Sequence, residues 1–381
     1  MRIFFTLVFI IICQLSLVGS LMAAPTLIPA APRVNAKAYL LIDHNSGHIL
    51  AEKNADKKIE PASLTKLMTA YVALYEIERG GISIEDEVKI SEKAWRMGGS
   101  RMFVEVNTYV TVEQLLKGLI VQSGNDASVA LAEHIASSES AFVELMNQHA
   151  ERLEMSSTHF NNSTGWPDNN HYTTARDLAK LSRAIIDDFP THYPSYKIKQ
   201  YTYNNIKQYN RNRLLWLDER VDGLKTGHTD AAGYCLISSA KSKGMRLISI
   251  VTGTTRDDAR IAASRKLLNY GFRFFETNLI YKANTAITNM RIWKGEEQNL
   301  SLGIAKDVYV TAPKGQLKKV KKNIKVEAMI EAPIVQGQRY GQVNIMLGEN
   351  KLATQSLIAL SSINEGGLWR KMVDNIQLMF Q

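Results

Sequence analysis

The sequence predicts an α+β protein, in which an antiparallel sheet covered by helices is followed by a small all-β domain. Strand patterns flank a turn at residues 45–47 and recur at residues 221–229, 233–240 and 246–252. Helical periodicity fills most of the interval between these two groups of strands. This order of elements is typical of a sheet with helices on both faces. After about residue 276, short alternating strands dominate, and they are expected at 292–293, 308–310, 324–330 and 343–346.

Composition sets broad limits. The 381-residue chain is 45% hydrophobic and 22% charged, which is typical of a globular protein with a large core. Its length suggests two or three domains. The formal charge of +9 favours an anionic partner but does not distinguish nucleic acid, a lipid surface and an acidic polymer.

The N-terminus predicts export. A basic start, an apolar run and a small-residue end make residues 1–23 a secretory signal peptide, with an uncleaved anchor as the alternative. After cleavage Cys235 is the one remaining cysteine, so we expect no intrachain disulfide. The sequence has no zinc-binding spacing of Cys or His, and we expect neither a metal nor a cofactor.

The start of one predicted helix places a hydroxyl beside an amine. Pro61 suits a helix entrance, and Ser63 and Lys66 lie one turn apart on the same face. A serine becomes a nucleophile when a base takes its proton, and burial or nearby positive charge lowers the pKa of a lysine. We therefore expect Ser63 to be a nucleophile with Lys66 as its base. Taken alone, the motif also fits a helix-capping serine beside a solvated lysine.

Two further motifs follow in order. Ser123-Gly-Asn125 lies in a break between two predicted helices, one at 111–120 with Thr111 as its N-cap and one at 127–135. There it can face a cleft or simply form a turn. Lys225-Thr226-Gly227 lies within a predicted strand. Together with Ser63-x-x-Lys66, these motifs form a trio that is characteristic of penicillin-binding proteins and class A β-lactamases.

The sequences around the trio resemble the low-molecular-mass penicillin-binding proteins that are serine-type D-alanyl-D-alanine carboxypeptidases of peptidase S11 type. The similar segments are Pro-Ala-Ser-Leu-Thr-Lys-Leu-Met-Thr, Ser-Gly-Asn-Asp-Ala, Val-Asp-Gly-Leu-Lys-Thr-Gly-His-Thr and Thr-Thr-Ala-Arg-Asp-Leu-Ala. The resemblance covers nearly the whole mature chain. It implies a penicillin-binding/β-lactamase-like domain and removal of the terminal D-Ala from the peptidoglycan pentapeptide stem, with β-lactams as inhibitors and no nucleic-acid partner.

The resemblance also implies catalytic roles. Ser63 attacks the penultimate D-Ala carbonyl and forms an acyl-enzyme, while Lys66 accepts its proton. Ser123 relays a proton between Lys66, Lys225 and the leaving amine. The backbone N–H groups of Ser63 and His228 form the oxyanion hole.

Substrate binding falls to other residues of the motifs. Asn125 is expected to hydrogen-bond the substrate's peptide group. Lys225 and Thr226 meet the terminal carboxylate, and Gly227 lets the strand edge approach the substrate closely. Two arginines are further candidates for the carboxylate: Arg260 and Arg211.

The chain divides into a signal peptide at 1–23, a catalytic domain at 24–276, a β-rich domain at 277–365 and an amphipathic helix at 366–381. The last segment is too short to span a bilayer. Its aromatic and Met-rich face predicts an interfacial membrane anchor, with docking on its own domain or a partner as the alternative. The resemblance implies that this anchor lies on the periplasmic side of the cytoplasmic membrane. Basic residues 314–325 fit a solvated hairpin or an anionic contact.

Three alternative functions are open for a sequence with these motifs. A β-lactamase shares the trio, but the class A pattern has Asp where this chain has Gly124, and no Glu-x-x-Leu-Asn element precedes Thr173. Endopeptidase activity on cross-links would use the same residues. An envelope scaffold would need none of the trio, and the intact trio argues against that reading.

Overall fold

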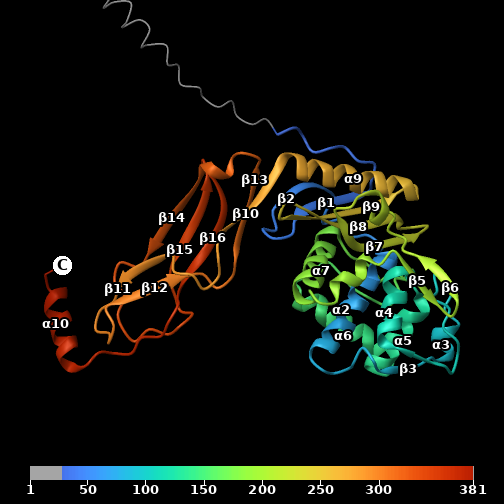
Figure 1. Ribbon diagram of the computed structural model, residues 1–381, viewed down its shortest axis with the longest axis horizontal. Coiled ribbons are helices and arrows are strands. Elements are labelled where there is room, and N and C mark those ends of the chain that lie inside the picture. Colours follow the sequence, from blue (N-terminus) through green and yellow to red (C-terminus); the bar gives the residue numbers. More distant parts are fainter. Residues whose placement is uncertain (1–27, 381) are drawn as a thin grey trace, which may run out of the picture. The chain divides into compact units, whose positions relative to one another are not determined.

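A computed structural model describes residues 28–380, so the predicted signal peptide lies outside the described part. The central sheet has five antiparallel strands in the order β2-β1-β9-β8-β7 (Figure 1). The predicted N-terminal hairpin supplies two strands, and the later strand patterns supply three. They are β1 (Ala38–Asp43), β2 (Ile49–Lys53), β7 (Val221–Thr229), β8 (Gly233–Ser242) and β9 (Met245–Thr254).

Both faces of this sheet are buried. Leu236 and Val251 belong to a cluster that packs with α9 (Asp257–Phe274), whereas their neighbours Ile237 and Ile250 belong to the cluster on the helical side. Successive residues of a strand point to opposite faces, so one strand serves two cores. The helix-covered antiparallel sheet predicted from the sequence is therefore confirmed.

The helical side is built around α2 (Lys66–Glu78), whose residues from Lys66 to Leu74 are all buried. Four further helices surround it: α4 (Val112–Val121), α5 (Asn125–Ala136), α6 (Glu139–Arg152) and α7 (Ala175–Asp188). Shorter elements complete the domain: η1 (Ala62–Thr65), β3 (Glu87–Lys89), α3 (Glu92–Trp95), β4 (Tyr109–Thr111), η2 (Tyr193–Lys197), β5 (Gln200–Tyr203), β6 (Ile206–Tyr209) and α8 (Leu214–Leu217).

Local chemistry explains most helix ends. Thr111 caps α4 as predicted, and it does so through a reciprocal capping box with Gln114. Gly80, with φ +75°, follows the last turn of α2. The predicted helix from Pro61 is not continuous, because a 3₁₀ turn with a bond from Leu64 N–H to Pro61 C=O comes first. The α5 helix starts at Asn125, two residues earlier than the helix expected from residue 127.

The β-rich part contains a second five-stranded sheet in the order β11-β12-β16-β15-β14. The strand expected at Ile292-Trp293 forms only an isolated bridge from Trp293 to Glu331, and the strand expected at 324–330 instead spans Val320–Val326. The boundary predicted at residue 276 between the catalytic and the β-rich domain stays a prediction. The elements are β10 (Phe275–Tyr281), β11 (Thr288–Arg291), β12 (Asn299–Gly303), β13 (Val308–Pro313), η3 (Leu317–Lys319), β14 (Val320–Val326), β15 (Arg339–Leu347) and β16 (Asn350–Ala359).

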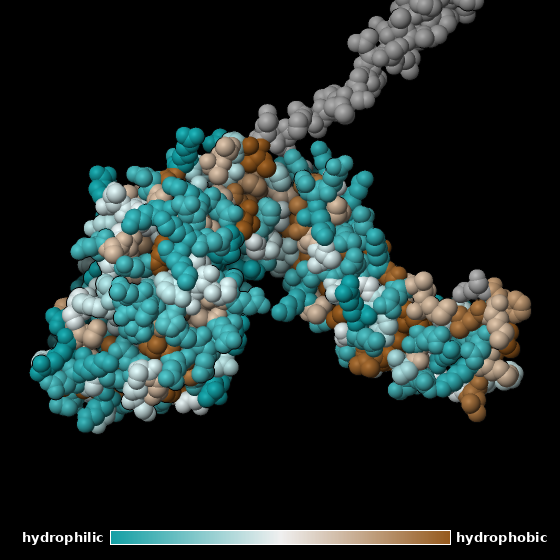
Figure 2. Space-filling view, turned by 180° about the vertical axis from the view of Figure 1, so that it is seen from behind, coloured by the Kyte–Doolittle hydropathy of each residue, from teal (hydrophilic) through white to brown (hydrophobic). Residues whose placement is uncertain are grey.

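The C-terminal helix α10 (Leu368–Leu378) is held through its polar face. Asp374 is 1% exposed, accepts a hydrogen bond from Lys294 N–H at 2.6 Å and pairs with Arg370 and Arg291 at 3.4 and 3.6 Å. The apolar side chains of the segment remain exposed, and they contribute to the brown surface at the right-hand end of Figure 2. They are Leu368, Trp369, Met372, Ile376, Met379 and Phe380. Within residues 28–380, no helix is long and apolar enough to cross a membrane.

Candidate active site

The first two motif residues meet at the entrance of α2. Ser63 lies in the 3₁₀ turn η1 and Lys66 is the first residue of α2, so one turn brings Lys66 Nζ to 3.1 Å from Ser63 Oγ. The preceding Ala62 has φ +48°, an unusual value for a residue with a Cβ. Backbone strain of this kind persists where the surrounding structure enforces it, and it is concentrated at functional sites.

Lys66 is buried and has two acceptors besides Ser63. Its Nζ donates to Asn125 Oδ1 at 2.7 Å and to the Thr164 carbonyl oxygen at 2.6 Å, and the residue is 0% exposed. A charged ammonium uses all three of its N–H bonds in this arrangement. A neutral amine keeps two N–H bonds for Asn125 and Thr164, which leaves its lone pair directed at the Ser63 hydroxyl.

Electrostatics favour the neutral amine. Burial is the main cause that lowers the pKa of Lys66 to about 7, and the positive charge of Arg211 lowers it further. The Asp126 carboxylate opposes both effects. A base with a pKa near 7 is present in its proton-accepting form in about half of the molecules at neutral pH.

The second motif brings a hydroxyl onto the third. Ser123 has φ +67° in the turn between α4 and α5, and Lys225 Nζ donates to its Oγ at 2.8 Å. Lys225 is buried, and burial, Lys66, Arg211 and Arg260 hold its pKa well below the ordinary value. No hydrogen bond joins Ser123 to Lys66 in the described chain, so the expected relay is in place on its Lys225 side only.

Asn125, which is expected to hydrogen-bond the substrate's peptide group, also bonds to the protein itself. Its Oδ1 accepts from Lys66, and its Nδ2 donates to the Gly98 carbonyl oxygen at 2.7 Å. The carboxamide therefore positions the lysine first of all. Each end of an amide can form one more bond, so a substrate contact stays possible on geometric grounds.

Gly227 has an internal packing role. A Cβ on it would lie 3.1 Å from Pro61 O and 3.2 Å from Leu64 Cγ. The missing side chain thus lets β7 lie close against the turn that holds Ser63. β7 is an edge strand, and an extended ligand can add beside a strand in this position.

A cavity of about 910 Å³ opens over these groups. Ser63, Ser123 and Thr226 line it together with Gly227 and His228. The ring of exposed His228 packs against Tyr234, with ring centroids 4.0 Å apart. Lys66 and Lys225 lie behind this wall.

The two arginines also line the cavity, but they differ in availability. Arg211 is exposed, and within residues 28–380 its guanidinium forms no hydrogen bond or ion pair. Arg260 is 6% exposed and donates to the carbonyl oxygens of Gly227 and Cys235 as well as to Asp257. Arg211 is thus the arginine free to meet an anion, and Arg260 mainly ties α9 to the edge of β7.

Sequence reasoning missed residues that shape the site from behind. Asp126 accepts backbone N–H bonds from Met102, Phe103 and Val104, and so fixes the segment beside Asn125. Its position inside the Ser-Gly-Asn-Asp motif was the available signal. The Thr164 carbonyl had no signal, because a main-chain acceptor is common to every residue. Within the described residues, no three His, Cys, Asp or Glu side chains gather as metal ligands.

The fold and the paired Ser–Lys geometry define the class of penicillin-recognising serine acyl-transfer enzymes. The sequence matches the D-alanyl-D-alanine carboxypeptidase family, peptidase S11, over residues 26–256, and the C-terminal domain of penicillin-binding protein 5 over residues 275–365. The chain therefore belongs to the peptidase S11 family, the serine-type D-alanyl-D-alanine carboxypeptidases.

Individual relatives agree with this assignment. D-alanyl-D-alanine carboxypeptidase DacA of Escherichia coli is 43% identical over 363 residues, which cover 93% of this chain and 90% of the relative. The crystal structure of penicillin-binding protein 5 from Haemophilus influenzae superposes with a TM-score of 0.85 at 41% identity, covering 88% of this chain and 100% of that one. Penicillin-binding protein D2 of Listeria monocytogenes, solved in its ampicillin-bound form, gives 0.59 at 30% identity and covers 64% and 100%.

Proposed function

We propose that this enzyme removes the terminal D-Ala from peptidoglycan pentapeptide stems through an acyl-enzyme on Ser63. The observation that supports this most directly is the contact of 3.1 Å between Ser63 Oγ and a buried Lys66 amine whose pKa is about 7. Neutral Lys66 takes the hydroxyl proton as Ser63 Oγ attacks the penultimate D-Ala carbonyl. The C–N bond then breaks, the terminal D-Ala leaves with a proton, and water hydrolyses the ester.

The far side of the cavity suits the substrate's terminal carboxylate. Buried Lys225, the Thr226 hydroxyl and the free guanidinium of Arg211 are its proposed partners. Lys225 and Arg211 need not both be charged, because the pKa of Lys225 is lowered. The backbone N–H groups of Ser63 and His228 are the proposed oxyanion hole, and the close packing of β7 on the Ser63 turn supports this pairing.

The same geometry suggests that β-lactams acylate Ser63. A β-lactam presents a reactive carbonyl and a carboxylate in the places where the D-Ala-D-Ala terminus presents its own. Slow release of the adduct is expected, because the loop before Thr173 places no acidic side chain at the cavity to act as a base for water. This loop, residues 156–172, contains one acidic residue, Asp168, and it does not line the catalytic cavity. The Thr164 main-chain carbonyl, which is no proton acceptor for water at neutral pH, faces Lys66 instead.

The deciding experiment uses the chain without residues 1–23 and 366–381, incubated with a pentapeptide stem. D-Ala release that disappears in Ser63→Ala and after penicillin treatment, with one penicilloyl group on Ser63, supports the carboxypeptidase. Rapid penicillin turnover without D-Ala release would identify a β-lactamase. The absence of both D-Ala release and a penicilloyl adduct would favour the scaffold. Full cellular function of Ser63→Ala would favour it as well.

We further propose export and peripheral attachment to the periplasmic face of the cytoplasmic membrane. Support comes from the predicted signal peptide and from α10, which contacts its own domain through Asp374 and leaves Trp369 and Phe380 75% and 86% exposed. An amphipathic helix with this exposed face suits the bilayer interface. Deleting residues 366–381 should move the protein from the membrane to the soluble fraction, whereas retention on the membrane would refute the anchor.

A further inference from the structure

We propose that Glu139 is a positioning residue for Lys66, because it fixes the main chain of Ser163 and Thr164 so that the Thr164 carbonyl faces the Lys66 amine. Glu139 touches neither the cavity nor the motif residues. The inference rests on the proposed function, since it assigns Glu139 to the acylation of Ser63.

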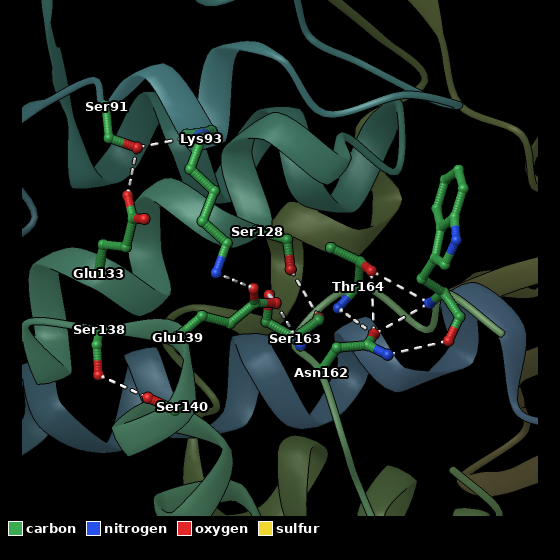
Figure 3. Close-up of polar contacts among 12 residues, drawn as sticks. Ser91, Lys93, Ser128, Glu133, Ser138, Glu139, Ser140, Asn162, Ser163 and Thr164 are labelled. Atoms are coloured by element: carbon green, nitrogen blue, oxygen red, sulfur yellow. Dashed lines mark hydrogen bonds and ion pairs between the residues drawn. The ribbon is translucent and has the colours of Figure 1, made fainter. Parts of the chain in front are cut away.

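Glu139 is a largely buried carboxylate with both oxygens engaged (Figure 3). Its Oε1 accepts from Ser163 N–H at 3.0 Å and from Ser163 Oγ at 2.7 Å, and its Oε2 pairs with Lys93 Nζ at 2.8 Å. Burial alone favours the neutral acid, but the bonds from Lys93 and Ser163 outweigh it and hold the pKa of Glu139 below its ordinary value. As the first residue of α6, the carboxylate is also favoured by the helix dipole.

Ser163 is held from three helices at once. Its N–H and hydroxyl reach Glu139 on α6, while its carbonyl oxygen accepts from Thr69 Oγ1 on α2 at 2.6 Å and from Ser128 Oγ on α5 at 2.7 Å. The residue is 0% exposed, so no water replaces a lost partner without rearrangement. Glu139 is the one charged member of this set.

Thr164, the next residue, connects the fixed Ser163 to the base Lys66. The Thr164 carbonyl oxygen is 2.6 Å from Lys66 Nζ. Asn162 Oδ1 closes the turn by accepting from the N–H groups of Thr164, Gly165 and Trp166 at 3.2, 2.8 and 3.0 Å. With Ser163 fixed on one side and the turn closed on the other, the Thr164 carbonyl keeps its direction, and so does the lone pair of Lys66.

The structure offers a matched control close by. Glu133 also accepts from a serine hydroxyl, that of Ser91, at 2.6 Å (Figure 3). It lies on the neighbouring helix α5, yet it forms no bond with residues 161–166. Replacing Glu133 therefore removes a similar carboxylate that has no bond to the loop behind Lys66.

The test compares wild type, E139A, E139Q and E133A in the chain without residues 1–23. Initial rates of labelling by a fluorescent penicillin between pH 5.5 and 9.5 are divided by the final label per chain. E139A should react about tenfold more slowly at every pH, which corresponds to losing one positioning interaction. E139Q keeps one acceptor oxygen for Ser163 and should stay within about threefold of wild type. E133A should match wild type.

Hydrogen exchange of peptides that contain residues 161–166 gives a readout independent of activity, and it should accelerate in E139A alone. E139A labelling within twofold of wild type, equal slowing in E133A, or unchanged exchange would overturn the proposal. If E139A does not fold, Ser163→Ala decides, because it removes only the hydroxyl bond to Glu139, and an unchanged rate refutes the role. A wild-type chain that neither labels nor releases D-Ala would instead refute the proposed function itself.

Discussion

Replacing Gly165 by alanine tests whether the loop behind Lys66 is as tightly constrained as the structure indicates. Gly165 has φ +82°, and a Cβ built on it would lie 1.8 Å from the Ala62 carbonyl oxygen and 2.3 Å from its carbonyl carbon. Real Cβ atoms essentially never come within 3.0 Å of such atoms, so the two backbones must separate by about 1.2 Å. Ala62 precedes the nucleophile and Thr164 precedes Gly165, so the movement reaches both Ser63 and the support of Lys66.

The size of the effect follows from two contributions. A left-handed conformation costs an L-residue about 1–2 kcal/mol. Forcing extra volume into a packed site costs a further 1–3 kcal/mol or so. The free energy of unfolding should therefore fall by roughly 2–5 kcal/mol in Gly165→Ala. Gly80→Ala is the control, because Gly80 has φ +75° with nothing within 4 Å of the added atom, and it should lose only the first contribution.

Urea denaturation measures both variants, and penicillin labelling measures the site. Gly165→Ala should label Ser63 at least about tenfold more slowly, since Lys66 loses its acceptor, whereas Gly80→Ala should label at the wild-type rate. Equal stability of the two variants would refute the steric argument. Normal labelling by a destabilised Gly165→Ala would refute the link between this loop and Lys66.

Four further predictions concern Lys66 and the charged groups around it, and three of them are read from the pH dependence of Ser63 acylation. In the wild type the rate should rise with pH and level off above a midpoint near 7, because the neutral amine is the base and its pKa is about 7; a flat profile from pH 5.5 to 9 would contradict this. Asp126→Asn removes the charge that raises this pKa, so the midpoint should fall, and an unchanged or higher midpoint would count against it. Asp126→Asn should also lose roughly 2–4 kcal/mol of stability in denaturation experiments, since backbone donors lose a charged acceptor. Arg211→Met removes a charge that lowers the pKa, so the midpoint should rise and the KM for the stem peptide should increase; a lower midpoint would show that Arg211 does not act on Lys66.

Much of the catalytic domain was predictable because its signals are local. The capping box at Thr111, the glycine stop at Gly80 and the strand patterns at 221–229 and 233–240 each depend on neighbouring residues in the chain. The β-rich part was harder, since short strands with weak alternation leave the ends undetermined. The strand expected at Ile292-Trp293, for example, forms only a single bridge.

The sequence by itself determined the order and identity of the chemical groups. Ser63 and Lys66 are one helical turn apart, so their proximity follows from local geometry alone. The motifs at Ser123 and Lys225 could be recognised as parts of one site through resemblance, but no local rule brings together residues separated by about a hundred positions.

Only the tertiary structure decided how the site is tuned. The pKa of Lys66 depends on burial and on the charges of Arg211 and Asp126, which reach it from different elements. The direction of its lone pair depends on the carbonyl oxygen of Thr164 and, as we propose, on Glu139 behind it. Desolvation and main-chain hydrogen bonding are properties of packing, and a residue's identity does not reveal which carbonyl oxygen it will meet.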